Sequence, residues 1–284
     1  MNKLLDSKPI FSPADLLENL GICLDLRLKD ASLSTTNAVR LFNGFYEGLA
    51  RLTVDRYAQT LVISDHEREG TSRRELHQAI AQFYIKTLPV VQSVLLKQRH
   101  AQDAKLRQGE LTFGEQVSTS IEENSVNYAL DLRLNQDTSF YPDTRNLRLW
   151  LSQQMKDARV LNCFAYTGAL GIAALAGGAR EVIQTDLNPH FLAVAERSQA
   201  LNHFNGTTQT ISQDFYPMVA SFKSQSQLFD CVILDAPLFS QTRRGRVDLL
   251  QNWQGLINKV RPLVGHEGWL VAINNALFLP GAEL

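Results

Sequence analysis

Cysteine is scarce in this chain of 284 residues, and long apolar runs and an excess of charge of one sign are missing. Its cysteines, Cys23, Cys163 and Cys231, are odd in number and far apart, which argues against a disulfide framework or a zinc cluster. No apolar run approaches the roughly 20 residues that cross a bilayer, and no signal-type apolar block precedes the first acidic residues. We therefore expect a reducing, cytoplasmic location with no metal site and no membrane association.

The charges almost balance, with 28 Lys and Arg against 29 Asp and Glu, and give a formal net charge of −1. Such a chain has no general attraction to phosphate, so any binding of nucleic acid has to come from local clusters of basic residues. Its length and its hydrophobic content of 44% allow one large domain and one smaller domain, each with its own core.

The first half of the chain is dominated by short apolar strands. Residues 49–55 and 60–65 are predicted to form a hairpin, residues 72–84 a helix, and residues 89–97 another strand. Further strands are expected around 111–134. We divide the chain into an N-terminal helical segment (1–37), a small α+β accessory domain (38–135) and a larger α/β domain that is apparently short at its C-terminal end (136–284).

From about residue 146 onward, predicted strands and helices alternate. This pattern indicates a mostly parallel, doubly wound sheet of the Rossmann-like type, covered by helices on both faces. One helix is expected over 169–176, and another over 190–202, after Asn188 as its cap and Pro189 in its first turn. The expected strands are residues 159–164, 181–185, 208–212, 231–234 and 269–274.

Ligands of such sheets bind beyond the carboxyl ends of the strands. After the first strand, Gly168 would let the backbone approach a ligand, although a strand-to-helix turn that merely needs one glycine explains it equally well. Asp186 ends the second strand eighteen residues later, where a carboxylate can accept hydrogen bonds from ribose hydroxyls. Asp186 could instead cap the next helix, but Asn188 already supplies a cap.

Two more acidic residues follow strands. Asp214 comes after the third strand and is expected either to accept a hydrogen bond from an adenine amine or simply to cap a helix. Asp235, followed by Ala236 and Pro237, comes after the fourth strand, where a buried carboxylate is costly unless something pairs with it. Three acidic strand ends and one glycine turn suit a ligand that has adenine and ribose but no pyrophosphate, which is S-adenosylmethionine.

The motifs resemble those of a known family, the class I methyltransferases that modify large-subunit (23S) ribosomal RNA at 5-methylcytosine or 7-methylguanine. The resemblance covers roughly residues 38–275, and its most specific part is N-C-F-A-Y-T-G at 162–168. A second part, T-S-F-Y-P-D-T-R at 138–145, resembles a segment that flanks the cofactor and adds Asp143 and Arg145 to the site. The resemblance implies that the remaining cofactor contacts come from Asn162, Phe164, Tyr166, Thr167, Gly168, Asp186, Leu187, Asp214 and Asp235.

The chain also departs from the family pattern. The usual D-P-P after the fourth strand reads Asp235-Ala236-Pro237, and the glycine of the flanking segment is Ser139. The N-terminal RNA-binding module of many members has no counterpart. We assign Asp235 and Pro237 as catalytic.

The position of the cysteines bears on which base is modified. Formation of 5-methylcytosine requires a cysteine thiolate that adds to the ring, and the family's cytosine enzymes carry it after the fifth strand, where this chain reads A-I-N-N-A-L-F-L. The Asn274-Asn275 pair and the segment 238–244 are closer to the 7-methylguanine branch. Guanine N7 is already nucleophilic, so this reaction needs alignment and no covalent catalyst.

Contacts with substrate RNA are expected beside Asp235. The predicted residues are Phe239, Arg243, Arg244, Arg246 and Asn274, although a core role explains Phe239 about equally well. A second basic cluster, Lys97 to Arg107, is interspersed with acidic residues and is equally well explained as a solvated loop.

Two other functions stay open: a methyltransferase of small molecules or proteins, and an incomplete, non-catalytic relative that binds cofactor or RNA. Only residues 276–284 follow the fifth strand. We therefore expect this strand to be an exposed edge, with low stability or concentration-dependent association, a homodimer included, and weak or absent turnover.

Overall fold

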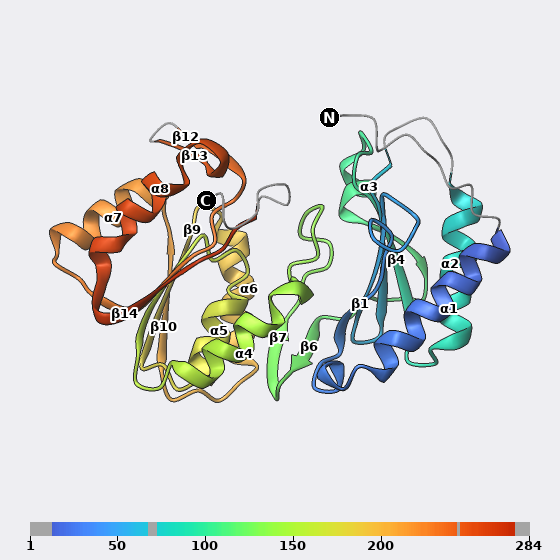
Figure 1. Cartoon of the computed structure of the whole chain (residues 1–284), viewed down its shortest axis with the longest axis horizontal. Helices are drawn as coiled ribbons and strands as arrows, with labels where there is room; N and C mark the ends of the chain where they lie inside the picture. The colour runs from blue at the N-terminus through green and yellow to red at the C-terminus, as the bar shows by residue number, and fades with distance from the viewer. Residues whose placement is uncertain (1–12, 68–72, 243–244, 276–284) are drawn as a thin grey trace. The chain divides into compact units, whose positions relative to one another are not determined.

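A computed structural model describes residues 13–67, 73–242 and 245–275 and divides the chain into two compact units, Met1–Pro142 and Asp143–Leu284 (Figure 1). Each unit has a five-stranded sheet and its own hydrophobic core. No helix within the described ranges is both long and apolar enough to cross a membrane.

The first unit is built on a mixed sheet of order β1-β2-β3-β4-β5. Its strands are β1 (Ala38–Asn43), β2 (Leu52–Tyr57), β3 (Thr60–Asp65), β4 (Ser93–Gln98) and β5 (Glu110–Phe113). The predicted hairpin is confirmed, because β2 and β3 pair antiparallel from Leu52↔Asp65 to Tyr57↔Thr60. The predicted helix is also confirmed as α2 (Arg74–Thr87), which connects β3 to the parallel strand β4.

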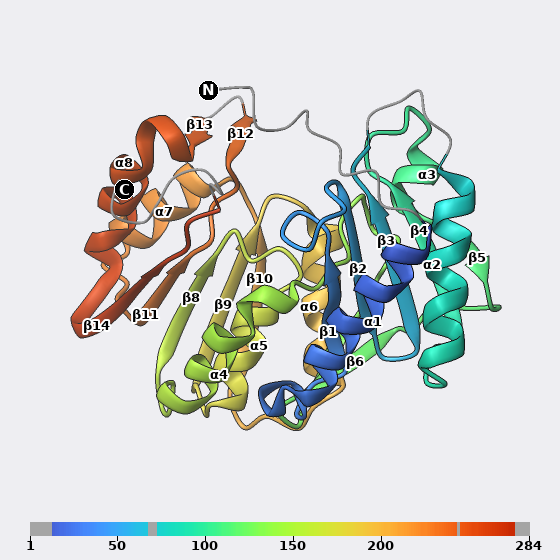
Figure 2. The same cartoon turned by 45° about the vertical axis from the view of Figure 1, so that its right-hand side comes forward.

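Helix α1 (Pro13–Lys29) and α2 each bury one set of apolar residues against this sheet (Figure 2). One continuous core contains Leu20 of α1, Phe42 of β1 and Ile80 of α2, all fully buried. The unit continues through the short helix α3 (Ala104–Gln108) and a second hairpin, β6 (Ser120–Glu123) with β7 (Val126–Ala129).

The second unit contains the predicted doubly wound sheet. Its order is β10-β9-β8-β11-β14, and every pair in it is parallel. Figure 1 shows α7 and α8 on one face and α4, α5 and α6 on the other. The strands are β8 (Arg159–Cys163), β9 (Glu181–Asp186), β10 (Thr207–Ser212), β11 (Phe229–Leu234) and β14 (Val264–Ala272). The helices are α4 (Arg145–Gln154), α5 (Ala169–Ala176), α6 (Pro189–Ala200), α7 (Phe215–Ser224) and α8 (Leu249–Val260).

A β-hairpin that the sequence did not predict lies between β11 and α8. It pairs β12 (Phe239–Thr242) antiparallel with β13 (Gly245–Asp248). Strand β14 lies at one end of the sheet and, in the described part of the chain, pairs only with β11. The prediction that the fifth strand is an edge strand is confirmed for these residues.

Candidate functional site

The carboxyl ends of four parallel strands bring the predicted acidic residues to one edge of the second sheet. Register pairs Cys163 with Thr185, Ser212 with Asp186, and Leu234 with Cys163. Asp186 therefore lies at the same edge as the segments that follow β8, β10 and β11. This is the edge at which open α/β sheets bind ligands.

Residues 164–168, here called the cofactor turn, join β8 to α5 in a strained conformation. Phe164, Tyr166 and Gly168 have φ values of 56°, 51° and 78°, all in the left-handed region that favours glycine. Left-handed residues other than glycine concentrate at functional sites, where the surrounding structure holds them. At Gly168 a Cβ would also collide with Ala195 and with Gln184, so this glycine is needed for space as well as for φ.

Asp186 fixes the middle of the cofactor turn. Its carboxylate accepts hydrogen bonds from the backbone N–H of Tyr166 and of Asn188, each at 2.9 Å. Burial raises the pKa of Asp186, and the backbone hydrogen bonds oppose that rise. The cap of α6 is Asn188, whose side chain accepts from His190 N–H at 3.0 Å, so Asp186 is not the capping residue.

Asp214 is the N-cap of α7, which is one of the two roles expected from the sequence. Its side chain accepts a hydrogen bond from Tyr216 N–H at 3.1 Å. The next residue, Phe215, stacks on Phe164 of the cofactor turn with ring centroids 4.8 Å apart. The segment after β10 therefore packs directly against the turn after β8.

Asp235 follows β11 and is held by Asn275, the member of the Asn274-Asn275 pair that was not predicted as a site residue. Asn275 Nδ2 donates to Asp235 Oδ1 at 2.7 Å and to the carbonyl of Ala236 at 2.9 Å. Burial raises the pKa of Asp235, and the charge of Asp143 raises it further, whereas the Asn275 hydrogen bond lowers it. Pro237 is half-buried beside them, and Asn274, the predicted member of the asparagine pair, is also half-buried.

Asp143 is exposed, whereas Arg145, the first residue of α4, is half-buried. Three residues further on, Arg148 is buried, with Nη1 donating to Thr144 Oγ1 at 2.6 Å. Arg148 was not predicted, although the spacing R-N-L-R places both arginines one turn apart on α4.

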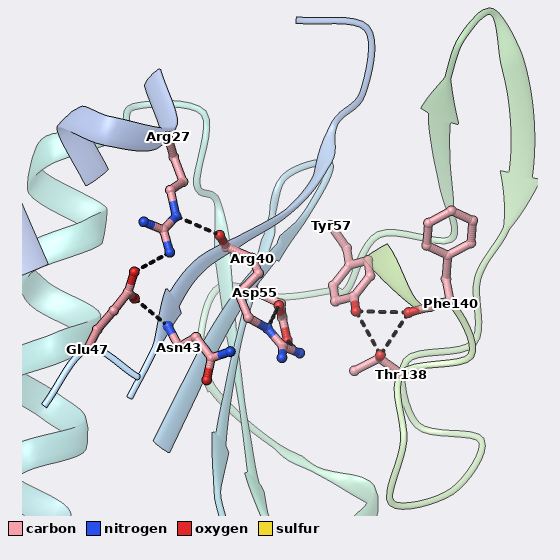
Figure 3. Close-up of polar contacts among 8 residues, drawn as sticks. All are labelled: Arg27, Arg40, Asn43, Glu47, Asp55, Tyr57, Thr138 and Phe140. Atoms are coloured by element: carbon pink, nitrogen blue, oxygen red, sulfur yellow. Dashed lines mark hydrogen bonds and ion pairs between the residues drawn. The ribbon is translucent and has the colours of Figure 1, made fainter. Parts of the chain in front are cut away.

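The start of the flanking segment is fastened within the first unit (Figure 3). Tyr57 of β2 has its hydroxyl 2.8 Å from Thr138 Oγ1 and donates to the carbonyl of Phe140 at 3.0 Å. Between them Ser139 has a φ of 58°, in the left-handed region that glycine adopts most readily. Ser139 Oγ accepts a hydrogen bond from Asp131 N–H at 2.8 Å.

Two of the predicted RNA contacts, Phe239 and Arg246, fall on the unpredicted hairpin. Phe239 of β12 is 54% exposed, and the guanidinium of Arg246 on β13 lies 5.1 Å from the centre of its ring. Arg246 also forms an ion pair with Asp248. Arg243 and Arg244 lie outside the described residues.

The cysteines of the second unit are unsuited to nucleophilic attack. Cys163 and Cys231 are both fully buried in the sheet. Burial raises the pKa of each thiol to about 12, so both remain protonated and unreactive at neutral pH.

Residues 40–282 match the model of a family described as S-adenosylmethionine-dependent methyltransferase. This match spans most of the chain. The chain belongs to this family. The resemblance inferred from the motifs is therefore confirmed, and so is the cofactor of the family, S-adenosylmethionine.

Curated relatives in this family carry the name ribosomal RNA large subunit methyltransferase I. The protein from Aeromonas salmonicida is 34% identical over 201 residues, which are 69% of this chain and 50% of the relative. That from Tolumonas auensis is 29% identical and aligns with 84% of this chain and 61% of its own length. The chain thus spans about half the length of the curated relatives it matches.

Solved structures show the same fold. The methyltransferase SMU.776, determined in complex with SAH, superposes with a TM-score of 0.85 at 21% identity and covers 98% of this chain and 71% of its own. A complex of aTrm5 with tRNALeu reaches a TM-score of 0.58 at 18% identity, covering 94% of this chain and 68% of its own.

Proposed function

We propose that the chain binds S-adenosylmethionine at the carboxyl edge of the second sheet and transfers its methyl group to a base of large-subunit ribosomal RNA. The observation that carries the proposal is the meeting of the cofactor turn, Asp186 and Asp235 at this edge, each after a different strand. The names of the curated relatives, ribosomal RNA large subunit methyltransferase I, support RNA as the substrate.

The residues at this edge fit the cofactor. Asp186 is a half-buried carboxylate that accepts hydrogen bonds from two backbone N–H groups, and its remaining lone pairs suit the ribose hydroxyls. Its position agrees with the ribose contact of related folds. The other proposed cofactor contacts are Asp143, Arg145, Asn162, Phe164, Tyr166, Thr167, Gly168, Leu187, Asp214 and Asp235.

S-adenosylmethionine supplies an electrophilic methyl group on a sulfonium. The chain's own task is to align the acceptor base, and we assign this to Asp235 and Pro237. The Asp235 carboxylate can accept a hydrogen bond from an N–H of the base, and Asn275 holds that carboxylate in place. Pro237 then gives the following segment a fixed φ as it leaves the site.

We propose guanine N7 as the acceptor because the described cysteines offer no nucleophile for cytosine. Cys163 and Cys231 are buried, with pKa values raised to about 12. The exposed ring of Phe239 under Arg246 suits stacking with a base of the substrate, with Arg243, Arg244 and Asn274 as further RNA contacts.

Mass spectrometry of nucleosides from large-subunit ribosomal RNA, with and without the gene, tests the proposal. We expect 7-methylguanosine to fall without the gene, to return with the wild-type gene and not to return with Asp235→Asn. A fall in 5-methylcytidine would refute the choice of base. Unchanged ribosomal RNA, with methyl transfer to a small molecule or protein, would refute the choice of substrate.

A second test addresses the covalent route directly. Because both cysteines of the second unit are buried, we expect RNA containing 5-fluorocytosine to form no adduct that survives denaturation. An adduct that disappears in Cys231→Ser would show that the chain is a cytosine enzyme.

A further inference from the structure

Gln184 is a buried amide that lies beneath the cofactor turn. It belongs to β9, is fully buried and pairs in register with Asn162 of β8. Its Oε1 accepts a hydrogen bond from Asn162 Nδ2 at 3.3 Å. Among the described residues, Gln184 Nε2 and Asn162 Oδ1 have no hydrogen-bond partner. Because unpartnered buried polar atoms cost stability, the presence of glutamine here indicates a role other than stabilising the sheet.

Two glycines make room for this amide. A Cβ at Gly168 would lie 2.6 Å from Gln184 Oε1, and so would a Cβ at Gly171. Gly168 also has a left-handed φ, but Gly171 lies within α5 and has no such φ. At Gly171, then, space alone demands glycine, and Gln184 takes up most of that space.

We propose that Gln184 is a positioning residue for S-adenosylmethionine, because its carboxamide sets how closely the cofactor turn and the start of α5 approach β9. Gln184 touches no reacting atom and acts through Gly168 and Gly171. The proposal rests on the proposed function, since it concerns the same cofactor site.

A double-mutant cycle between Gly171 and Gln184 tests the packing. Gly171→Ala places a methyl group against the amide, and we expect it to weaken SAH binding about tenfold. Gln184→Ala removes the support of the turn and should weaken binding about fivefold. In the double variant the new methyl group enters the vacated space, so we expect an affinity within about threefold of wild type. Losses that simply multiply would overturn the proposal.

A second variant separates positioning from stability. Gln184→Met keeps the length of the side chain but not its planar amide, and should change Tm by less than about 3 °C while weakening SAH binding at least about fivefold. The matched control is Val260→Ala, which leaves a cavity in the core beside α8. It should lower Tm without changing the affinity for SAH. A lower Tm with unchanged affinity in Gln184→Met would overturn the proposal.

The wild-type chain separates failure of this proposal from failure of the proposed function. If wild type binds no SAH in calorimetry, the proposed function fails and this proposal falls with it. If wild type binds SAH and Gln184→Met binds it equally well, only the role of Gln184 fails.

Discussion

Two aspartates in this chain end a β-strand in the same way and have opposite surroundings. Asp65 ends β3 in the first unit, where it accepts from His77 Nε2 at 2.7 Å and from Arg73 Nη1 at 2.9 Å. Although burial opposes it, the hydrogen bond from His77 and the charge of Arg73 hold the pKa of Asp65 below its usual value. Asp186 ends β9 in the second unit, and it accepts hydrogen bonds from the backbone N–H groups of Tyr166 and Asn188.

The difference shows what an acidic strand end can do. The charge of Asp65 is neutralised by side chains of its own unit, which makes it part of the fold. Burial raises the pKa of Asp186 and of Asp235, and neither has an ion pair among the described residues. Asp186 and Asp235 are half-buried. A partly buried acid without a cation lowers stability, and such acids concentrate at sites where a ligand supplies the missing partner.

The largest effect of a substitution is expected for cofactor binding at Asp186. Asp186→Ala should weaken SAH binding by about 1.5–3 kcal/mol, because a charge-assisted hydrogen bond to the ligand is lost. Asp65→Asn is the matched control, which should lower the free energy of unfolding and leave SAH affinity unchanged. Calorimetry on both variants tests the comparison, and unchanged affinity in Asp186→Ala would remove Asp186 from the site.

Lys97 allows a test of the first unit by pH. It is fully buried, and its Nζ donates to the carbonyls of Asn135 and Asp137 at 2.9 and 2.7 Å. Burial lowers the pKa of Lys97 from 10.5 to about 7. The folded chain therefore holds this proton less tightly than the unfolded chain does, and raising the pH from 7 toward 10.5 favours folding.

Between pH 7 and about pH 9, we expect the stability of wild type to rise by on the order of 2 kcal/mol relative to Lys97→Met. Urea denaturation at several pH values measures this difference. A difference that does not vary with pH would show that the pKa of Lys97 in the folded chain equals its pKa in the unfolded chain, so that burial does not lower it.

Ser139 tests backbone strain in the flanking segment. Ser139→Ala keeps the left-handed φ but loses the hydrogen bond from Asp131 N–H, and should cost about 1 kcal/mol. Ser139→Gly loses the same bond but relieves the backbone, so its net effect should be close to zero. Equal losses in the two variants, measured by thermal unfolding, would show that the backbone at this position is not strained.

The strands, their order in the chain and their acidic ends could be predicted from the sequence. Apolar runs that stop at Asp186 or before Asp235 carry a local signal, and parallel pairing then brings those ends together without further information. The β12–β13 hairpin could not be predicted this way, because Gln241 and its polar neighbours give no alternation of apolar and polar residues.

Contacts between residues far apart in the chain could not be predicted from the sequence either. Asn275 reaches Asp235 across forty positions, and only the adjacency of β11 and β14 brings them together. Gln184 looks like one polar residue within a strand, and its closeness to Gly168 and Gly171 exists only in the folded sheet. Tertiary packing decides such contacts, so local patterns leave them open.

The smallest effect of a substitution is expected for association of the chain through the edge strands of the two sheets. Strand β5 ends the first sheet with four residues, among them the exposed Glu110, and such short charged edges resist pairing with other chains. Among the described residues, strand β14 ends the second sheet with nine residues, and its Trp269 is 54% exposed. Long edge strands with exposed apolar side chains favour association.

We therefore expect the 284-residue polypeptide to associate weakly through β14. Trp269→Lys should raise the dissociation constant of that association several-fold, which corresponds to roughly 1 kcal/mol of association free energy. The substitution removes apolar area and places like charges opposite each other. Phe113→Lys on β5 is the control, because Phe113 is 44% exposed on the short edge and its replacement should change nothing. Sedimentation velocity over a range of concentrations measures both variants. If the sedimentation coefficient of wild type does not depend on concentration, β14 is protected from pairing. If both variants weaken association equally, exposed apolar area rather than the strand edge drives it.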